Sequence, residues 1–312
     1  MTRAQSPTPT SNGEPGPATG APGSGAVRPG APAAGHPDPE PAREPVEPAH
    51  GGWPDGDPRR GAPATGWAAS HDRREGERDA AEPAVTFRNV TKRYGAVEAL
   101  RDVSFSLPPG TVTGLVGANG SGKSTLLKLA AGFVHPSAGE VRVLGRAPSI
   151  AERRQIAFVA EVDPLDGWMT VDQTVRFVRW FFPDWDEEHE GELREILELP
   201  GHRRVGELSK GMRTRVRLLL GLARTAPLVL LDEPFSGIDP VSRRRVADAI
   251  LAACRRGGRT ILLSTHDLKD AEPLFDRLMV LARGRLVLEG EADEIRAQRG
   301  KSIEDVVEEV LG

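Results

Sequence analysis

The nine residues GANGSGKST, residues 117–125, constrain the fold of this chain more than any other stretch of its sequence. They follow TVTGLVG, an apolar and β-rich segment, and they lead into KSTLLKLAAGF, whose apolar residues recur with helical spacing. The spacing G-x-x-x-x-G-K followed by Ser or Thr, between a strand and a helix, is typical of a loop that binds phosphate. A glycine-rich turn that matches by chance is the alternative, and the flanking strand and helix argue against it. The segment therefore predicts a strand–helix unit with a phosphate site.

The groups of this loop suit a nucleoside triphosphate and its magnesium ion. Gly117, Gly120 and Gly122 let successive backbone N–H groups turn inward around phosphate oxygens, and the dipole of the following helix adds positive potential. Lys123 is expected to bridge the β- and γ-phosphates, and the hydroxyl of Ser124 is expected to bind Mg²⁺. The expected nucleotide-binding residues of the loop are Gly117, Ala118, Asn119, Gly120, Ser121, Gly122, Lys123, Ser124 and Thr125.

A pair of acidic residues supplies the second half of the expected site. In LVLLDEP, residues 228–234, four apolar residues predict a buried strand, and Asp232 emerges at its carboxyl end, where ligands of open α/β sheets bind. Asp232 is expected to hold Mg²⁺, and Glu233 is expected to orient or deprotonate an attacking water. An acidic pair at a strand end is often only a helix cap, but the phosphate loop favours the catalytic interpretation.

Two further side chains are candidates for contact with the nucleotide. His266 ends the segment ILLSTH, at the carboxyl edge of another expected strand, which favours a contact with the γ-phosphate over a packing or surface role. Tyr94, the single tyrosine, lies in the turn KRYGA. It is either a surface ring or the aromatic face on which an adenine stacks.

Strand and helix patterns alternate along the body of the chain, which predicts an α/β fold with a largely parallel sheet covered by helices. An antiparallel strand pair is expected around Arg283 and Gly284, and helix starts are expected at Thr170 and Asp184. The predicted parts are a disordered Pro-, Gly- and Ala-rich tail over residues 1–82, a body over 83–290 with a helical subdomain inserted at about 162–222, and a helical extension over 291–312. In the extension, one helix face is expected to collect Ile303, Val306, Val307 and Val310.

Charge and composition exclude several kinds of protein. The net charge of −4 gives no sign of a nucleic-acid-binding surface. No stretch of about 18 apolar residues occurs, so the chain is not expected to cross a membrane itself. Its single cysteine, Cys254, excludes an internal disulfide and a multi-cysteine metal site, which fits a reducing cytoplasm.

The order of the phosphate loop, LSKGM, LVLLDEPFSGIDP and STH resembles that of the ATP-binding subunits of ABC transporters, over about residues 84–291. The resemblance implies a P-loop NTPase with a RecA-like core, ATP and Mg²⁺ as ligands, and Tyr94 as the adenine-stacking ring. It also implies that LSKGM is the signature loop and that residues 236–239 are the D-loop. In that family two subunits close head to tail, so Ser209, Gly211 and Asp239 would contact the ATP of a second subunit. The implied assembly is a homodimer that drives a separate transmembrane permease from the cytoplasmic face of the membrane.

The sequence departs from the family pattern at two places. Lys210 and Met212 replace a glycine and the glutamine of the usual LSGGQ signature, while Ser209 and Gly211 are retained. Glu161, in IAFVAEVD, stands where the family has a glutamine, and it is expected to act as a hinge to the helical subdomain and as a candidate metal ligand beside Ser124 and Asp232.

Two segments narrow the resemblance and leave an alternative open. FFPDWDEE and the C-terminal KSIEDVVEEVLG look like the bacitracin-type, ABC-2 branch of bacterial exporters, which favours export. The rival classes are a soluble ABC-type ATPase without a transport role and a non-hydrolysing regulatory subunit. The single phosphate loop, the absence of long coiled coils, and the retained Lys123, Glu233 and His266 argue against them.

Overall fold

The computed structural model describes residues 82–162 and 164–312. The tail predicted over residues 1–82 therefore lies, apart from Glu82, outside the described residues. The predicted bounds of the helical subdomain, at about 162–222, and of the C-terminal extension, at 290–291, stay predictions.

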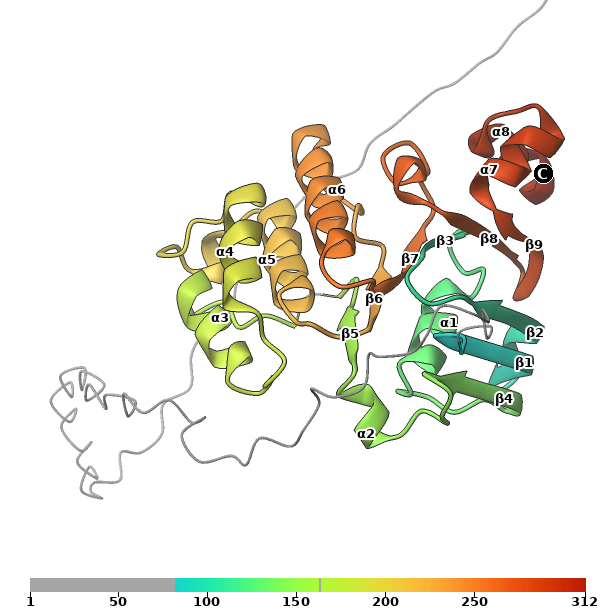
Figure 1. The fold of residues 1–312 in the computed structure, drawn as a ribbon, viewed down its shortest axis with the longest axis horizontal. Coiled ribbons are helices and arrows are strands. Elements are labelled where there is room, and N and C mark those ends of the chain that lie inside the picture. The colour runs from blue at the N-terminus through green and yellow to red at the C-terminus, as the bar shows by residue number, and fades with distance from the viewer. Residues whose placement is uncertain (1–81, 163) are drawn as a thin grey trace, which may run out of the picture. The chain divides into compact units, whose positions relative to one another are not determined.

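The larger of two sheets has six strands (Figure 1). In order across the sheet they are β5 (Ile156–Val159), β6 (Leu228–Asp232), β7 (Thr260–Thr265), β3 (Val112–Val116), β8 (Arg277–Ala282) and β9 (Arg285–Glu291). The first five run parallel, and β9 pairs antiparallel with β8. Every residue of β3, β6 and β7 is buried, as expected for parallel strands covered on both faces. The predicted α/β class, with a mainly parallel sheet and an antiparallel edge, is confirmed.

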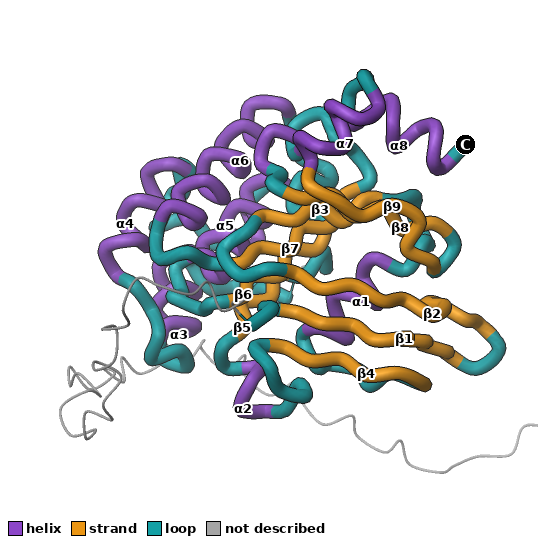
Figure 2. The backbone as a smooth tube through the Cα atoms, turned by 45° about the vertical axis from the view of Figure 1, so that its right-hand side comes forward, coloured by secondary structure: helices purple, strands orange, loops and turns teal. Residues whose placement is uncertain are grey.

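The smaller sheet is antiparallel, with the order β2 (Val97–Leu107), β1 (Val85–Tyr94) and β4 (Ala138–Val143) (Figure 2). On its inner face the rings of Phe87 and Phe105 stack with centroids 4.6 Å apart. This face, helix α1 (Lys123–Ala130) and one face of the larger sheet enclose a common core. Along β6, Leu228 and Leu230 enter this core, while Val229 and Leu231 enter a second core on the opposite face. The larger sheet thus separates two cores.

The second core is covered by helices, several of which come from the inserted segment. They are α3 (Val171–Arg179), α4 (Glu187–Ile196), α5 (Lys210–Leu222) and α6 (Pro240–Arg255), with a 3₁₀ turn at Val205–Glu207. Thr170 begins α3 as predicted, because its hydroxyl accepts from the Gln173 N–H and the Gln173 side chain accepts from the Thr170 N–H. The helix start predicted at Asp184 is wrong.

Asp186 caps α4 instead, since its Oδ1 accepts from the His189 N–H at 2.9 Å. Asp184 lies two residues too early to reach that N–H group, and its carboxylate is held by Arg224, with Nη2 at 2.9 Å from Oδ2.

The remaining elements are short. They are α2 (Ile150–Arg153), a 3₁₀ turn at Glu272–Leu274, α7 (Ala292–Arg299) and α8 (Ile303–Leu311). In α8, the predicted apolar face is confirmed, because Ile303, Val306 and Val307 are buried in the second core and Val310 packs against it. Strand β5 has no counterpart among the predicted strands.

Candidate nucleotide-binding and hydrolysis site

The phosphate loop connects the end of β3 to the start of α1, and its glycines are required by the local backbone. Gly122 has φ 112° and precedes the helix without a side chain that could cap it. A Cβ on Gly122 would lie 2.6 Å from the carbonyl oxygen of Ala99, and one on Gly117 would lie 2.3 Å from that of Leu281. The backbone N–H groups of the first helical turn, including those of Lys123 and Ser124, therefore have no side-chain cap and are available to an anion.

Lys123 reaches back over this loop. Its side chain is 5% exposed, and its Nζ donates to the carbonyl oxygens of Gly117 at 2.7 Å and Ala118 at 3.3 Å. Nζ also lies 3.2 Å from Oε1 of Glu233 as an ion pair, although that oxygen accepts no hydrogen bond among the described residues. A buried ammonium surrounded by oxygens is suited to take a phosphate oxygen in exchange.

Ser124 and Asp232 meet at the carboxyl end of β6. The Ser124 hydroxyl donates to Oδ1 of Asp232 at 3.1 Å, although 108 positions separate the two residues. Ser264, in β7, donates to the same oxygen at 2.7 Å. Asp232 is only 5% exposed, so these hydrogen bonds supply the stabilisation that a buried carboxylate needs.

Glu233 follows directly and is held in a strained conformation. Its φ is +50°, a left-handed value that is uncommon outside glycine. Its N–H donates both to the Ser264 hydroxyl at 3.0 Å and to the Ser264 carbonyl oxygen at 3.2 Å. Its Oε2 lies 2.8 Å from Nδ1 of His266, the residue that follows β7. The structure therefore brings Lys123, Ser124, Asp232, Glu233 and His266 together at one edge of the sheet.

Ser264 is a member of this cluster that the sequence reasoning missed. Its hydroxyl joins the two acidic residues, because it donates to Asp232 and accepts from the Glu233 N–H. The available signal was its place in STH, as a polar residue directly after the apolar run at residues 261–263 of a fully buried strand.

Ser209, Gly211 and Asp239, which are expected to contact the ATP of a second subunit, lie together at the starts of α5 and α6. Ser209 caps α5, with its hydroxyl accepting from the Met212 N–H at 3.2 Å. A Cβ on Gly211 would lie 3.2 Å from Cγ2 of Ile238, and Asp239 caps α6 by accepting from the Ser242 N–H at 3.0 Å. This hydrogen-bonding to Ser242 lowers the pKa of Asp239. Helices α5 and α1 lie apart in both views, with β5 and β6 between them (Figures 1 and 2).

Tyr94 borders the phosphate loop through a hairpin. Its ring is 45% exposed and lies 4.9 Å from Nζ of Lys92. Tyr94 pairs with Val97 at the start of β2, and two residues further along, the Ala99 carbonyl packs against Gly122. Tyr94 is therefore exposed on the hairpin whose second strand contacts the phosphate loop, and its role as an adenine platform stays a prediction.

Glu161 follows the edge strand β5, and its side chain is exposed. Arg217 of α5 donates to the carbonyl oxygens of both Ala160, at 2.6 Å, and Glu161. The described contacts do not join the Glu161 carboxylate to Ser124 or Asp232, so its role as a metal ligand stays a prediction.

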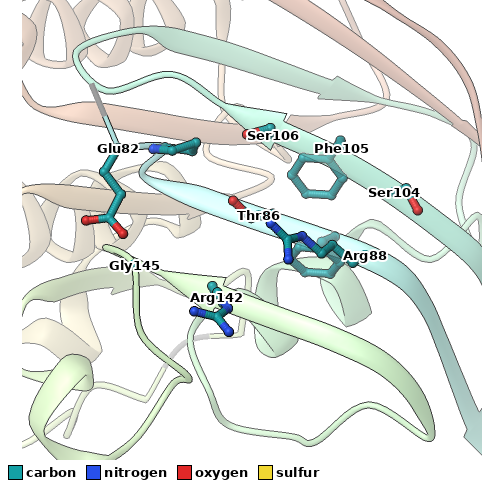
Figure 3. Close-up of a pocket in the computed structure, with 10 residues that line it drawn as sticks. Glu82, Thr86, Arg88, Ser104, Phe105, Ser106, Arg142 and Gly145 are labelled. Carbon is teal, nitrogen blue, oxygen red and sulfur yellow. The ribbon is translucent and has the colours of Figure 1, made fainter. Parts of the chain in front are cut away.

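One cavity lies elsewhere, on the outer face of the smaller sheet (Figure 3). Thr86, Arg88, Ser104 and Arg142 line it, and both arginines are paired with Glu140. None of the predicted site residues lines this cavity, so it is not the candidate site. Among the described residues, no group of three or more His, Cys, Asp or Glu side chains is arranged to hold a metal ion.

Comparison with known proteins identifies the family. The family model described as ABC transporter matches residues 100–236. The Nod factor export ATP-binding protein I of Burkholderia orbicola is 36% identical over 214 residues, which cover 66% of this chain and 70% of that protein. The protein of the same name from Rhizobium johnstonii is 36% identical over 215 residues, which cover 66% and 69%. This chain belongs to the ABC transporter ATP-binding proteins. The resemblance based on motif order is thus confirmed, and the chain is an ATPase of the ABC type.

Solved structures of ABC ATPases share the fold. An ATP-binding subunit of an ABC transporter, 29% identical, superposes with a TM-score of 0.65 and covers 73% of this chain and 100% of its own. A dimeric bacterial ABC transporter cassette, 24% identical, gives a TM-score of 0.60 over 66% and 98% and supports the fold alone. In the part of this ABC ATPase that the structure describes, no helix has both the length and the apolarity needed to span a bilayer.

Proposed function

We propose that this chain hydrolyses ATP in a Mg²⁺-dependent manner as the energising subunit of an exporter, and that two copies close on two ATP molecules to drive a separate membrane permease. The convergence of Lys123, Ser124, Asp232, Glu233 and His266 at one sheet edge carries the proposal. Each of these residue types has a chemical task in phosphoryl transfer to water.

The Ser124 hydroxyl and the Asp232 carboxylate fit a magnesium ion. Both are hard oxygen donors, and 3.1 Å separates the two oxygens. Mg²⁺ is usually held by one or two such side chains together with waters and substrate phosphates, so a larger protein cage is not needed. When bound, the ion would neutralise charge on the phosphate oxygens.

The chain's own residues would supply binding, proton acceptance and orientation. Lys123 would exchange the carbonyl oxygens of Gly117 and Ala118 for phosphate oxygens, and in doing so leave Glu233. The freed Glu233 carboxylate would accept a proton from the attacking water. His266, bonded through Nδ1 to Glu233, would hold that carboxylate in place and offer its other ring nitrogen to the γ-phosphate.

A second copy would complete each site. Ser209, Gly211 and Asp239 cluster around the starts of α5 and α6, and α5 is separated from α1 by β5 and β6 in both views (Figures 1 and 2). A Ser hydroxyl and a helix start are suited to a phosphate, and we assign them to the nucleotide of the second copy.

Steady-state hydrolysis tests the site and the dimer together. The specific activity should fall as the wild-type chain is diluted, because separated copies lack half of each site. Glu233→Gln should abolish turnover and retain ATP-dependent dimers in size-exclusion chromatography. A specific activity independent of dilution would contradict the dimer, and full activity of Glu233→Gln would remove Glu233 from the reaction.

The permease is proposed to dock on an exposed aromatic patch of the inserted segment, formed by Phe177, Trp180 and Phe181. These residues are 45%, 70% and 56% exposed. The ring centroids of Phe177 and Phe181 are 5.1 Å apart, and those of Trp180 and Phe181 are 5.4 Å apart. Contiguous exposed aromatic surface marks protein interaction sites, where Trp and Arg dominate binding. Export follows from the relatives, which are named as export ATP-binding proteins.

Membrane retention tests the patch. In cells that contain the transporter, Trp180→Ser with Phe181→Ser should release the chain from the membrane fraction while its ATPase activity in solution is unchanged. Val287→Ser, at another exposed apolar residue, is the control and should leave retention unchanged. Retention of the double variant at the wild-type level would contradict docking through this patch.

A further inference from the structure

Arg243, in the first turns of α6, contacts two other segments of the chain, the loop before α6 and the turn that follows β7. Its Nη1 donates to Oδ2 of Asp267 at 2.9 Å and to Oδ2 of Asp270 at 2.8 Å. Its Nε donates to the carbonyl oxygen of Ile238 at 3.3 Å. The planar guanidinium is suited to this arrangement, because its N–H groups point in fixed and different directions.

Asp267 holds the turn that carries His266. The Thr265 hydroxyl accepts from the Asp267 N–H at 3.0 Å and donates to its carbonyl oxygen at 2.8 Å. One carboxylate oxygen of Asp267 accepts from the Lys269 N–H, and the other accepts from Arg243. Arg243 thereby ties the backbone on the carboxyl side of His266 to helix α6.

The histidine itself has little packing to fix it. The His266 side chain is 43% exposed, and its described polar contact is the one with Glu233 at 2.8 Å. The position of the ring relative to the Glu233 carboxylate therefore depends on the backbone of the turn from Thr265 to Asp267. That turn is what Arg243 holds.

The Nε–H of the same guanidinium contacts the loop of residues 236–239. Ile238 accepts from Arg243 through its carbonyl oxygen, and its side chain packs against Gly211 at the start of α5. Asp239, the next residue, caps α6. A displacement of this loop would therefore change the position of Arg243 and, through Asp267, that of His266.

We propose that Arg243 is a positioning residue that couples the loop of residues 236–239 to His266. The inference rests on the proposed function, in which that loop faces a second copy and His266 acts at the nucleotide. Contact of the second copy with this loop would then set the geometry of the Glu233–His266 pair in the same chain. The pKa of Arg243 is raised by its hydrogen bonds with Asp270 and Asp267, which is consistent with a tightly held guanidinium.

A double-mutant cycle on the full-length chain tests the coupling, with phosphate release measured at saturating and limiting ATP. Arg243→Gln should lower kcat about tenfold and leave KM within about twofold, because the nucleotide contacts are unchanged. Arg243→Lys should recover only part of kcat, since an ammonium cannot reproduce the three-way contact. Arg244→Gln is the matched control: its side chain is exposed, and its kcat should equal that of the wild type.

The decisive comparison uses the His266→Ala background. There, adding Arg243→Gln should change kcat by less than about twofold, because the residue through which Arg243 acts has been removed. An equal loss of kcat in both backgrounds, or an unchanged kcat in Arg243→Gln alone, would overturn the inference and leave the proposed function standing. If Arg243→Gln does not fold, Asp267→Asn is used in its place, because it removes the ion pair between positions 243 and 267. An equal loss of kcat in both backgrounds, or an unchanged kcat in Asp267→Asn alone, would then overturn the inference. A wild-type chain without ATPase activity would overturn both.

Discussion

The substitution Ser264→Ala tests whether the acidic pair is held in place by the neighbouring strand. The Ser264 hydroxyl donates to the buried Asp232 carboxylate at 2.7 Å and accepts from the Glu233 N–H at 3.0 Å. Alanine removes both contacts with little change of volume. The Glu233 N–H keeps the Ser264 carbonyl oxygen at 3.2 Å as an acceptor, so the main loss is the hydrogen bond to Asp232.

The magnitude follows from the burial of that carboxylate. A hydrogen bond to a charged group contributes about 1.5–3 kcal/mol to stability, so the free energy of unfolding should fall by about 2 kcal/mol. For a body of about 150–250 ordered residues, this corresponds to a decrease in Tm of about 4–8 °C. Urea unfolding and thermal melting, followed by circular dichroism, measure the two quantities. The ATPase rate should also fall, because Glu233 loses a contact that holds its strained backbone.

The matched control is Ser106→Ala on the outer face of the smaller sheet, where the serine is exposed. Its stability should stay within about 0.5 kcal/mol of the wild type. A Ser264→Ala protein with wild-type stability and wild-type ATPase activity would refute the assignment of Ser264 as the support of the acidic pair.

Three further predictions concern pH, the phosphate loop and a helix cap. Burial lowers the pKa of His189, so the folded protein binds this proton more weakly than the unfolded chain, and the free energy of unfolding should fall as the pH drops below 6.5. In urea titrations at several pH values, His189→Gln should reduce this dependence of the free energy of unfolding on pH, and His202→Gln, at an exposed residue, should not. An equal dependence on pH in both variants and the wild type would contradict the prediction. Gly122→Ala should abolish ATP binding in a fluorescent-nucleotide titration and destabilise the chain by about 1–3 kcal/mol, since φ is 112° and the Cβ meets a carbonyl oxygen. Gly191→Ala, in helix α4 with nothing within 4 Å, should instead bind normally, and normal binding by both would refute the steric argument. Thr170→Ala should lower the free energy of unfolding by about 1 kcal/mol through loss of its cap, measured by urea unfolding; no change would mean that the cap contributes nothing.

The fold, and the grouping of the candidate site residues at one sheet edge, could be predicted from the sequence because their signals are local. The phosphate loop lies in one continuous segment, Asp232 follows four apolar residues, and the strand before His266 contains an apolar run at residues 261–263. Parallel strands present their carboxyl ends at one edge, so residues that follow different strands meet there. This geometric rule is what joined Ser124 to Asp232 across 108 positions.

The features that were missed depend on neighbours that are distant in sequence. Strand β5 has four residues, too few for a clear period, and it exists because β6 offers it a parallel edge. Asp184 has the composition of a helix cap, but Arg224 from the end of the inserted segment takes its carboxylate. Ser264 has a role only through two residues of an adjacent strand end, Asp232 and Glu233.

In the protein without nucleotide, the Glu233 carboxylate competes with a phosphate of ATP for the Lys123 ammonium. A phosphate can recruit the Lys123 ammonium only by separating it from a carboxylate 3.2 Å away, at a site where both side chains are almost completely buried. The free energy needed to separate this ion pair lowers the observed affinity for ATP. A chain in which Glu233 is neutral should therefore bind nucleotide more tightly than the wild type, because the carboxylate proposed to act in hydrolysis no longer holds the Lys123 ammonium.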